Sequence, residues 1–545
     1  MNSSRKTKYI FITGGVISAL GKGIAAASIG YILKSRGFDV TIQKIDPYLN
    51  VDPGTMSPYQ HGEVFVLDDG SETDLDLGHY ERFLDINMTK DNNTTTGMVY
   101  QHVIERERAG DYLGSTVQVV PHITNEIERR ILKVGKNNEF DIVISELGGT
   151  VGDIEGLPFL EAIRQFKLKH GKDNCLNIHL TLVPYIHTAG EIKTKPTQHS
   201  VKQLREIGIS PDIILGRTKR HLDDKTREKI SLFCNVDFES VIEAIDADTI
   251  YEIPLLFEKQ KVGDIISHKL DLPMKQSRLA KLKKFVKIVK NPKHRVKIGI
   301  CGKYTELHDA YKSILESFVH AGVENNAEVV VKWLCAEELA TSDNPAEIMK
   351  DIDGLLIPGG FGERGIEGKI VAIREARVNN IPFFGICLGL QCAVIEFARN
   401  VCGLEKANST EFMEETEQPV IDLMEEQKKI TDMGGTMRLG QYPARIKKDS
   451  IAYDCYKKLN ISERHRHRYE VNNDYLETLK ENGLVIGAKN IELDLVEMIE
   501  YPGHPWFVAC QFHPELKSRI DRVHPLFKNF IKASLNYKKK SKDGK

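Results

Sequence analysis

The sequence predicts an α/β protein with two domains in series, the first of them a doubly wound, mostly parallel sheet of the phosphate-binding-loop type. Short apolar runs rich in β-branched residues alternate with helical patterns along the whole chain, which is typical of parallel sheets covered by helices. A glycine-rich loop follows the first of these runs. At 545 residues the chain is too long for one hydrophobic core, and a basic stretch near residue 280 separates two strand–helix series.

The first series contains apolar runs that are hydrophobic on both faces and end in polar or glycine turns, as buried parallel strands do. We expect strands in residues 8–15, 39–48, 140–149, 177–185 and 212–218. A helix rich in Ala and Ile runs from Lys22 to about Arg36 and ends at Gly37. Ligands of such sheets bind beyond the carboxyl ends of the strands.

The second series follows the basic stretch "KQSRLAKLKKFVKIVKNPKHRVK". Its helical spacing indicates a linker helix with a solvated face, which we favour over a partner-binding helix. Further strands are expected in residues 295–304, 327–335, 354–360, 381–389 and 506–515. The predicted organisation is therefore a domain at residues 1–268, a linker helix at 269–294, a domain at 295–537 and a disordered basic tail at 538–545.

Composition excludes several classes of protein. The 75 basic and 77 acidic side chains give a formal net charge of -2, which argues against a nucleic-acid binder. Nine scattered cysteines without a C-x-x-C pair argue against a zinc site and a disulfide framework. No apolar run approaches the roughly 20 residues needed to cross a bilayer. We therefore expect a cytoplasmic protein that binds neither nucleic acid nor membrane.

The loop "GGVISALGKG" resembles a phosphate-binding loop but departs from the usual pattern G-x-x-x-x-G-K-[ST]. Lys22 is followed by Gly23 instead of Ser or Thr, and the spacing back to Gly15 is one residue too long. Backbone N–H groups of such a turn, opening onto a helix, still bind anions. We expect a triphosphate here, with Lys22 and Lys44 adding positive charge. A turn that binds no ligand is the competing interpretation.

Without a hydroxyl after the lysine, Mg²⁺ needs carboxylate ligands from elsewhere, because this small, hard ion prefers oxygen. The segment "DDGSETDLDLGHYERF" carries a dense acidic cluster, and Glu146 ends a predicted buried strand. Spacing alone does not choose between Asp74 and Asp76. A solvated surface or a helix cap would explain either acidic segment taken alone.

The segment "PFFGICLGLQCAVIEFAR" predicts a cysteine nucleophile on a sharp strand-to-helix turn. Gly385 and Gly389 flank Cys387 and permit the turn, and the N-terminus of the following helix favours a thiolate. In "CQFHPE", His513 is the candidate base and Glu515 the group that orients it. The glycine turn in "LLIPGGFG" offers N–H groups to an oxyanion. Together these features predict acyl-transfer chemistry.

The segment "ERHRHRYEVN" is rich in basic side chains. A nucleic-acid site is one interpretation, but the segment is short and the chain is nearly neutral. We favour structural roles for some of these residues and a substrate carboxylate bound by one arginine.

These motifs resemble a known family. "PGGFGERG", "GICLGLQ", "NSTEF", "ERHRHRYEVN" and "CQFHPE" are similar to the class I (triad-type) glutamine amidotransferases. "TGGVISALGKGIAAAS", "GDYLGSTVQVVPHIT", "GGTVGDIE" and "TKPTQHSVK" resemble the amidoligase domain of the CTP synthase family. The resemblance spans nearly the whole chain, and strings of this length are very specific.

The resemblance implies a reaction at two sites. Glutamine is hydrolysed at Cys387 and releases ammonia, while the 4-oxygen of UTP takes the γ-phosphate of ATP. Ammonia then displaces that phosphate to give CTP. A sheltered path would keep ammonia neutral, and His61 lies in a segment that matches its entrance. The resemblance also implies Mg²⁺, activation by GTP, feedback inhibition by CTP and a homotetramer. Because the chain ends soon after the second domain, we expect a bacterial-type enzyme.

The resemblance also assigns residues to these roles. The catalytic residues are Cys387, His513 and Glu515. Glutamine-binding positions are Gly360, Leu388, Gly389, Leu390, Gln391, Glu411 and Arg468. ATP-binding positions are Ala19, Leu20, Gly21, Lys22, Gly23, Ile24, Asp74, Ile245, Asp246 and Ala247. UTP- and CTP-binding positions are Ser18, Lys44, Asp153, Ile154, Glu155, Lys193, Thr194, Lys195, Pro196, Thr197, Gln198 and Lys229. The magnesium positions are Asp74 and Glu146.

Two other functions compete with this interpretation. Another ATP-dependent amidotransferase, such as a cobyrinic acid diamide synthase, would also join a deviant phosphate loop to a glutaminase-like domain. "TKPTQHSVK" and "DLDLGHYERF" favour a nucleotide substrate instead. A regulatory ATPase switch with a relic glutaminase domain is the second competitor, and the intact Cys387, His513 and Glu515 argue against it.

Overall fold

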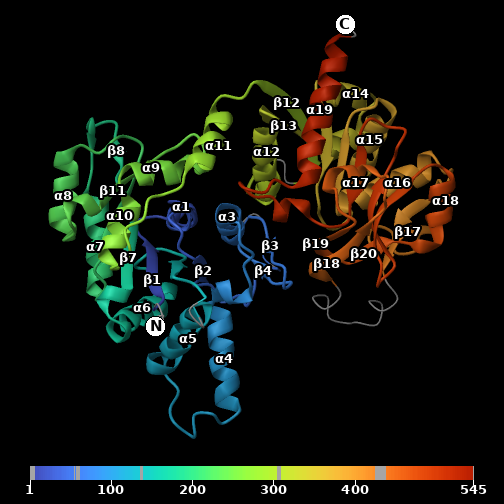
Figure 1. Cartoon of the computed structure of the whole chain (residues 1–545). Coiled ribbons are helices and arrows are strands. Elements are labelled where there is room, and N and C mark those ends of the chain that lie inside the picture. Colours follow the sequence, from blue (N-terminus) through green and yellow to red (C-terminus); the bar gives the residue numbers. More distant parts are fainter. Residues whose placement is uncertain are drawn as a thin grey trace, which may run out of the picture. The chain divides into compact units, whose positions relative to one another are not determined.

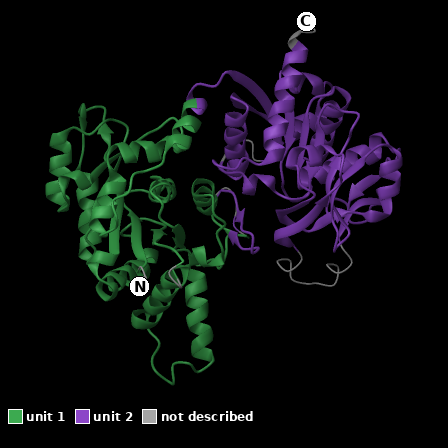
Figure 2. Cartoon of the chain, viewed as in Figure 1, with its two compact units in different colours: residues 1–55, 73–287 green, residues 56–72, 288–545 purple. Residues whose placement is uncertain are grey.

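The computed structural model describes residues 6–54, 56, 62–135, 139–303, 308–423 and 437–543. They form two compact units (Figures 1 and 2). Unit 1 contains residues 1–55 and 73–287, and unit 2 contains residues 56–72 and 288–545. None of the described helices is both long enough and apolar enough to span a membrane.

Unit 1 is built on a seven-stranded parallel sheet with the strand order β11-β10-β7-β1-β6-β2-β5. The strands are β1 (Lys8–Gly14), β2 (Val40–Asp46), β5 (Asn93–Thr95), β6 (Ile142–Leu147), β7 (Cys175–Leu182), β10 (Ile213–Thr218) and β11 (Val241–Ile245). The strands expected in this half are confirmed as β1, β2, β6, β7 and β10. The two edge strands were missed because both are short and carry polar residues. The short pairs β3 (Phe65–Val66) with β4 (Glu72–Thr73), and β8 (Tyr185–Ile186) with β9 (Glu191–Ile192), lie outside this sheet.

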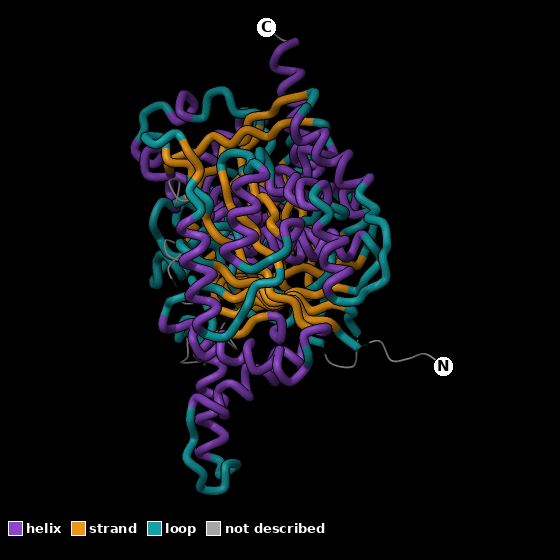
Figure 3. The backbone as a smooth tube through the Cα atoms, turned by 90° about the vertical axis from the view of Figure 1, so that its left-hand side faces the viewer, coloured by secondary structure: helices purple, strands orange, loops and turns teal. Residues whose placement is uncertain are grey.

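Helices cover both faces of this sheet, as a doubly wound fold requires (Figures 1 and 3). They are α1 (Lys22–Ser35), α3 (Leu75–Leu84), α4 (Thr96–Arg108), α5 (Thr124–Val134), α6 (Leu157–His170), α7 (Lys195–Glu206), α8 (Asp224–Cys234), α9 (Ile253–Lys259) and α10 (Val262–Lys269). On one face, α4, α5 and α6 enclose a core that includes Tyr9 and Phe11 of β1. On the other, Gly30 of α1 packs against Ile42 of β2. The predicted first helix is confirmed as α1.

Unit 2 is built on a nine-stranded sheet with the order β13-β12-β14-β15-β23-β22-β21-β18-β19. Its strands are β12 (His294–Gly302), β13 (Ala327–Cys335), β14 (Gly354–Ile357), β15 (Phe383–Ile386), β18 (Arg438–Ile446), β19 (Asn460–His467), β21 (Val485–Asn490), β22 (Leu495–Glu500) and β23 (Phe507–Cys510). The pairings from β13 to β23 are parallel and those from β23 to β19 are antiparallel. The five predicted strands are confirmed in the parallel half. The antiparallel half was missed.

The helices of unit 2 enclose two hydrophobic cores, one on each face of the sheet. They are α12 (Lys312–Glu324), α13 (Ala336–Thr341), α14 (Pro345–Ile348), α15 (Ile366–Val378), α16 (Leu388–Asn400), α17 (Ile451–Tyr456), α18 (Leu476–Glu481) and α19 (Pro525–Asp543). A three-stranded sheet of β16 (Ala407–Ser409), β17 (Gln418–Leu423) and β20 (Tyr469–Val471) completes the unit. At the strand-to-helix turn, Cys387 packs in one of these cores, whereas Leu388 and Leu390 of α16 pack in the other.

Two basic segments differ from the sequence expectation. The stretch 269–294 contains a shorter helix, α11 (Ala280–Lys290), and the boundary between the units falls within it. The tail for which the sequence predicts disorder is helical up to Asp543. Tyr537 packs against the hydrophobic core, and Lys538 Nζ pairs with Asp353 Oδ2 at 3.1 Å. These contacts explain why α19 continues into a lysine-rich sequence.

Residues 56–72 belong to unit 2, although they precede most of unit 1 in the sequence (Figure 2). Glu63 Oε2 accepts hydrogen bonds from the backbone N–H and the hydroxyl of Ser313 at the start of α12, at 2.9 and 2.6 Å. Arg464 of β19 donates to Asp68 Oδ1 at 2.5 Å. Polar contacts therefore hold a segment of the first half of the chain in the second unit.

The core of unit 1 supplies a stability test. Phe166 of α6 is fully buried, with its ring centroid 4.8 Å from that of Tyr9 and 5.4 Å from that of Phe11. We expect Phe166→Ala to lower the free energy of unfolding by about 3–5 kcal/mol, because it leaves a cavity. Leu168→Ala on the same helix removes a side chain that is 78% exposed and should change it by less than about 0.5 kcal/mol. Urea denaturation measures both, and equal effects would contradict this packing.

Candidate functional site

The glycine-rich loop joins β1 to α1. Gly21, the N-cap of α1, has φ +91°, a left-handed conformation that glycine tolerates. Lys22 folds back over the loop, where its Nζ donates to Gly149 O at 2.6 Å. A Cβ on Gly14 would lie 2.7 Å from Lys22 Cδ, so glycine is needed for this lysine conformation. Burial lowers the pKa of Lys22. The lysine and the free N–H groups of α1 thus form an anion-binding surface.

The structure gives a physical reason for Gly23, which replaces the usual Ser or Thr. A Cβ on Gly23 would lie 2.0 Å from Asp76 Oδ1. The Asp76 carboxylate, from the first turn of α3, therefore occupies the space that a larger side chain at position 23 would need. An acidic group stands beside the phosphate loop where related loops carry a hydroxyl.

Asp76 belongs to a buried charge cluster around Lys44, near the carboxyl end of β2. Lys44 Nζ pairs with Asp76 Oδ2 and lies 3.4 Å from Glu146 Oε1 and 3.6 Å from Asp46 Oδ1. Tyr80 donates its hydroxyl hydrogen to Glu146 Oε2. Burial lowers the pKa of Lys44, but the surrounding carboxylates, Asp76 foremost, raise it well above its ordinary value. Lys44 therefore remains a cation near the carboxyl end of β2.

The two candidate aspartates have different surroundings. Asp74 is the N-cap of α3, and its Oδ1 accepts a hydrogen bond from Leu75 N at 2.6 Å. Asp76 joins the Lys44 cluster with Glu146. In the described part of the chain, no group of three or more His, Cys, Asp or Glu side chains could hold a metal ion. Two carboxylates nevertheless fit Mg²⁺, which commonly completes its coordination with phosphate oxygens and water.

The predicted UTP and CTP positions lie mainly in loops at the carboxyl edge of the unit 1 sheet. Ser18 is exposed in the phosphate loop, and Asp153 to Glu155 follow β6 around a short 3₁₀ turn. The run from Lys193 to Gln198 covers the start of α7. Lys229 differs, because it lies within α8. A cavity of about 350 Å³ opens beside this run, lined by Val16, Lys195, Pro196, His199, Ser200 and Gln203. It connects the phosphate loop to the start of α7.

The predicted ATP positions divide between two loops of unit 1. Ala19 to Ile24 span the phosphate loop and the first turn of α1, with Ala19 at φ +57°. The second group begins at Ile245, the last residue of β11. Within it, Asp246 Oδ1 pairs with Arg217 at 2.7 Å. Both groups follow parallel strands, where this fold binds ligands.

Cys387 occupies a strained turn between β15 and α16. Its φ of +52° and ψ of −102° are unfavourable for a residue with a Cβ. A Cβ on Gly385 would lie 2.8 Å from Gly389 O, and a Cβ on Gly389 would lie 2.3 Å from Ile357 O. Both glycines are therefore required by close backbone packing. The turn places Cys387 at the N-terminus of α16, as the sequence predicts.

His513 and Glu515 lie beside this cysteine. His513 Nδ1 is 2.7 Å from Glu515 Oε1, and a Cβ on Gly359 would lie 2.7 Å from His513 Cε1 and 3.6 Å from Cys387 Cβ. Burial lowers the pKa of His513, but Glu515 and then Cys387 raise it to about 10. The imidazole is therefore held as a cation between the carboxylate and the sulfur. Gln511 Nε2 also donates to Cys387 Sγ at 3.7 Å.

The predicted glutamine-binding residues surround the same turn. Glu411 Oε1 accepts from Gly362 N at 2.6 Å, which fixes the glycine turn after β14. Gln391 Nε2 donates to Tyr469 O at 3.0 Å. Burial raises the pKa of Glu411, and the nearby positive charge of Arg468 offsets part of this increase. Arg468 Nε is buried and has no hydrogen-bond partner among the described residues. A cation with an unmet donor suits a substrate carboxylate.

The basic segment 463–472 is structural over much of its length. Arg464 pairs with Asp68, and Arg466 pairs with Glu72 at 2.6 Å. His465 and His467 are buried side by side, and burial holds the pKa of both well below the ordinary value. These contacts leave no exposed basic stripe for nucleic acid. The partners of these arginines are acidic residues of the segment 56–72, nearly 400 positions earlier in the sequence, which the motif alone does not predict. His61, expected near an ammonia path, lies outside the described residues.

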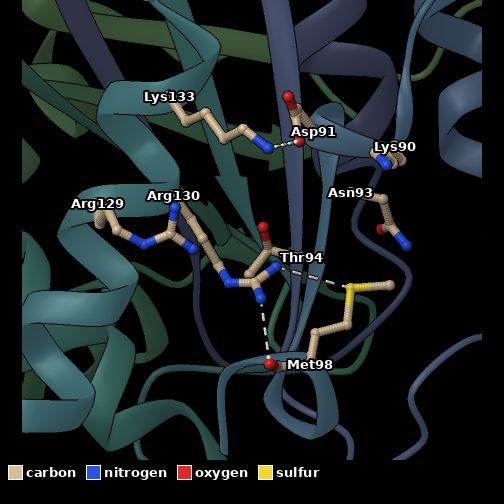
Figure 4. Close-up of a pocket in the computed structure, with 8 residues that line it drawn as sticks. All are labelled: Lys90, Asp91, Asn93, Thr94, Met98, Arg129, Arg130 and Lys133. Carbon is tan, nitrogen blue, oxygen red and sulfur yellow. Dashed lines mark hydrogen bonds and ion pairs between the residues drawn. The ribbon is translucent and has the colours of Figure 1, made fainter. Parts of the chain in front are cut away.

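A separate cavity of about 240 Å³ lies at the β5 edge of unit 1 (Figure 4). Its lining residues are Lys90, Asp91, Asn93, Thr94, Met98, Arg129, Arg130 and Lys133. Lys133 Nζ is 2.7 Å from Asp91 Oδ1, and Glu126 pairs with Arg129 and Arg130. Because each of these three cations already has a carboxylate partner, with Glu126 shared by the two arginines, we assign no ligand to this cavity.

Comparisons with known proteins cover both units. The family model described as "CTP synthase N-terminus" matches residues 8–272, and the model "Glutamine amidotransferase class-I" matches residues 306–533. A CTP synthase of Clostridium acetobutylicum is 59% identical over 98% of this chain and 100% of its own length. One of Caldanaerobacter subterraneus is 58% identical over 97% of this chain and 99% of its own length. A solved glutaminase domain of Trypanosoma brucei CTPS with bound acivicin is 39% identical, with a TM-score of 0.42 over 44% of this chain and 94% of that one.

The family models and the relatives together cover the chain from the phosphate loop to the His513 segment. The enzyme is thus a glutamine-hydrolysing ligase with an amidoligase domain and a glutamine amidotransferase domain. The resemblance inferred from sequence motifs is confirmed. The chain belongs to the CTP synthase family.

Proposed function

We propose that unit 2 releases ammonia from glutamine through a covalent thioester on Cys387. The Cys387 thiolate attacks the side-chain amide carbon, and the His513 imidazolium gives its proton to the departing ammonia. Water then hydrolyses the thioester to glutamate. The observation that carries this proposal is the strained turn of Cys387 beside a His513–Glu515 pair. Leu388 begins α16, so its N–H lacks an intrahelical partner and, with that of Gly360, is available to the oxyanion.

Glutamine is recognised by charges of opposite sign. The unmet donor of Arg468 suits the α-carboxylate, and the Glu411 carboxyl group suits the α-amino group. Gly389, Leu390 and Gln391 belong to the first turn of α16, beside the nucleophile. Burial raises the pKa of Glu411, so binding of a cationic amino group would favour its charged form.

Unit 1 binds ATP and UTP and transfers the γ-phosphate of ATP to the 4-oxygen of UTP. Lys22 and the phosphate loop bind the triphosphate of ATP, and Lys44 adds a positive charge near the phosphates of UTP. Mg²⁺, when bound, neutralises charge on the transferred phosphate. We assign it to Asp76 and Glu146 in preference to Asp74, because Asp76 faces the loop at Gly23 whereas Asp74 caps α3. The predicted ATP loops and the Lys193–Gln198 run supply the remaining contacts.

The regulatory and assembly properties of the family extend to this chain by the same proposal. CTP, which shares its triphosphate with UTP, inhibits at the UTP position, and GTP activates. The enzyme acts as a homotetramer in the cytoplasm. Apolar side chains that are exposed on unit 1 support such an assembly. These are Leu113, Val119, Val120, Ile154 and Leu157. Burial of such side chains between subunits is favourable.

Replacement of the nucleophile separates the two reactions. In Cys387→Ala we expect glutamine-dependent CTP formation to fall at least ~1,000-fold, because no thioester forms. CTP formation with added ammonia should stay near the parent rate. Conversion of UTP, followed spectrophotometrically with ATP and Mg²⁺, measures both. Glutaminase activity that survived in this variant would refute the assignment of Cys387, and a parent enzyme that never aminated UTP would refute the proposed function.

The two aspartates of α3 can be distinguished by matched substitutions. Asp76→Asn removes a charge beside the phosphate loop and should lower CTP formation by ~100-fold or more, with either nitrogen donor. Asp74→Asn should cost less than ~5-fold, because Asn is as good an N-cap as Asp. Rates measured over a Mg²⁺ titration test this. The opposite order of effects would return the metal site to Asp74.

The raised pKa of His513 predicts a pH-dependent contribution to stability. A histidine whose folded pKa is raised to about 10 from its ordinary 6.5 stabilises the fold fully below 6.5, and this stabilisation is lost as pH rises through 10. In Glu515→Gln the chief cause of the raised pKa is absent. The difference in free energy of unfolding between parent and variant should therefore shrink from pH 7 to pH 10 in urea denaturation. A constant difference would show that His513 is not held as a cation by Glu515.

A further inference from the structure

The edge strand β19 presents its backbone to the glutaminase site. It ends the order of the nine-stranded sheet, with β18 as its neighbour. Arg464 O accepts a hydrogen bond from His513 N at 2.7 Å, and Arg466 O lies 3.9 Å from Cys387 Sγ. Just beyond the strand, Tyr469 O accepts from Gln391 Nε2. The position of this backbone therefore sets the positions of three groups in the site.

Two buried histidines, His465 and His467, form a chain of hydrogen bonds that ends at the Tyr469 carbonyl. His467 Nδ1 is 3.2 Å from Tyr469 O and must carry the hydrogen, since a carbonyl only accepts. Its Nε2 is then the acceptor for His465 Nδ1, at 2.9 Å. That leaves His465 Nε2 without a hydrogen, 3.3 Å from Glu497 Oε2. Geometry alone thus fixes the tautomers of both rings.

The Glu497 carboxyl group lies beside His465. Its Oε2 is 3.3 Å from His465 Nε2 without forming a hydrogen bond, and burial raises the pKa of Glu497. Arg438 donates to the other oxygen of Glu497 at 2.8 Å and to Glu470 Oε1 at 3.0 Å. Arg438, Glu470, Glu497 and both histidine rings are buried. None of them needs to contact substrate.

We propose that His467 is a positioning residue for glutamine binding: held in one tautomer by His465, it fixes the Tyr469 carbonyl and thereby Gln391 and the adjacent Arg468. The proposal rests on the proposed glutamine site. Arg468 Nε has no hydrogen-bond partner among the described residues, so its backbone must place it before the substrate arrives. Arg464 and Arg466 project to the opposite face of β19, where they bind Asp68 and Glu72. The histidine chain therefore acts on the backbone from the other side.

Paired substitutions at position 467 test this role. His467→Leu removes the donor to Tyr469 O and should raise the KM for glutamine about 10-fold, as expected for about 1.4 kcal/mol of lost binding. His467→Asn keeps an N–H near the place of Nδ1 and should restore the KM to within about 3-fold of the parent. CTP formation with ammonia should be unchanged in both. An unchanged KM in His467→Leu, or no recovery in His467→Asn, would overturn the proposal.

A second variant covers the case in which His467→Leu does not fold. Glu497→Gln keeps an oxygen that accepts from Arg438 and leaves the contacts of His465 and His467 in place, so the KM for glutamine should stay within about 3-fold. A 10-fold increase would overturn the assignment of the positioning role to the two histidines.

His504→Leu is the structural control. His504 is buried and lies 3.1 Å from Ala376 O, in the turn that precedes β23. Its loss should lower the unfolding temperature without changing the KM for glutamine. An equal rise in KM would show that any buried histidine has this effect. If instead the parent enzyme used ammonia but not glutamine, the proposed glutamine site would fail, independently of His467.

Discussion

At Gly23 the first turn of α1 approaches the Asp76 carboxylate so closely that a Cβ would lie 2.0 Å from its oxygen. At Gly389 the first turn of α16 approaches β14 so closely that a Cβ would lie 2.3 Å from Ile357 O. Both are helix N-termini that follow a parallel strand. In each unit, close packing at a glycine lets a chemical group occupy the end of the sheet. The carboxylate in unit 1 and the thiol in unit 2 both depend on this absence of a side chain.

The buried charged side chains around Lys44 in unit 1 are already paired with one another before any nucleotide binds. Lys44 is surrounded by carboxylates, and these, with Asp76 foremost, keep its pKa high despite burial. Burial raises the pKa of Glu146 and lowers that of Lys22. A triphosphate adds negative charge that competes with the carboxylates for the lysines. A divalent cation beside Asp76 and Glu146 would then restore the balance, so phosphate and metal should bind more favourably together than either does alone.

The parallel strands could be predicted because their sequences are apolar on both faces. The G-x-C-x-G turn could be predicted because a sharp strand-to-helix turn leaves no room for side chains at its two glycines. The strand β19 could not, since "NISERHRH" alternates buried histidines with arginines whose partners lie far away in the sequence. The proposed assignment of the metal to Asp76, where the resemblance implies Asp74, also rests on the structure. Asp74 and Asp76 are two residues apart near a helix start, where one caps and the other faces the loop. Asp46 was missed, although it follows Lys44 by two residues on a predicted strand.

Residues 56–72 belong to unit 2, although the sequence on both sides of them belongs to unit 1. Glu72 pairs with Arg466 on the strand whose carbonyl contacts Cys387, and Asp76, beside the phosphate loop, follows it by four residues. The arginines of the basic segment thus have a structural use that needs no nucleic acid: within unit 2 they bind the acidic side chains of Asp68 and Glu72.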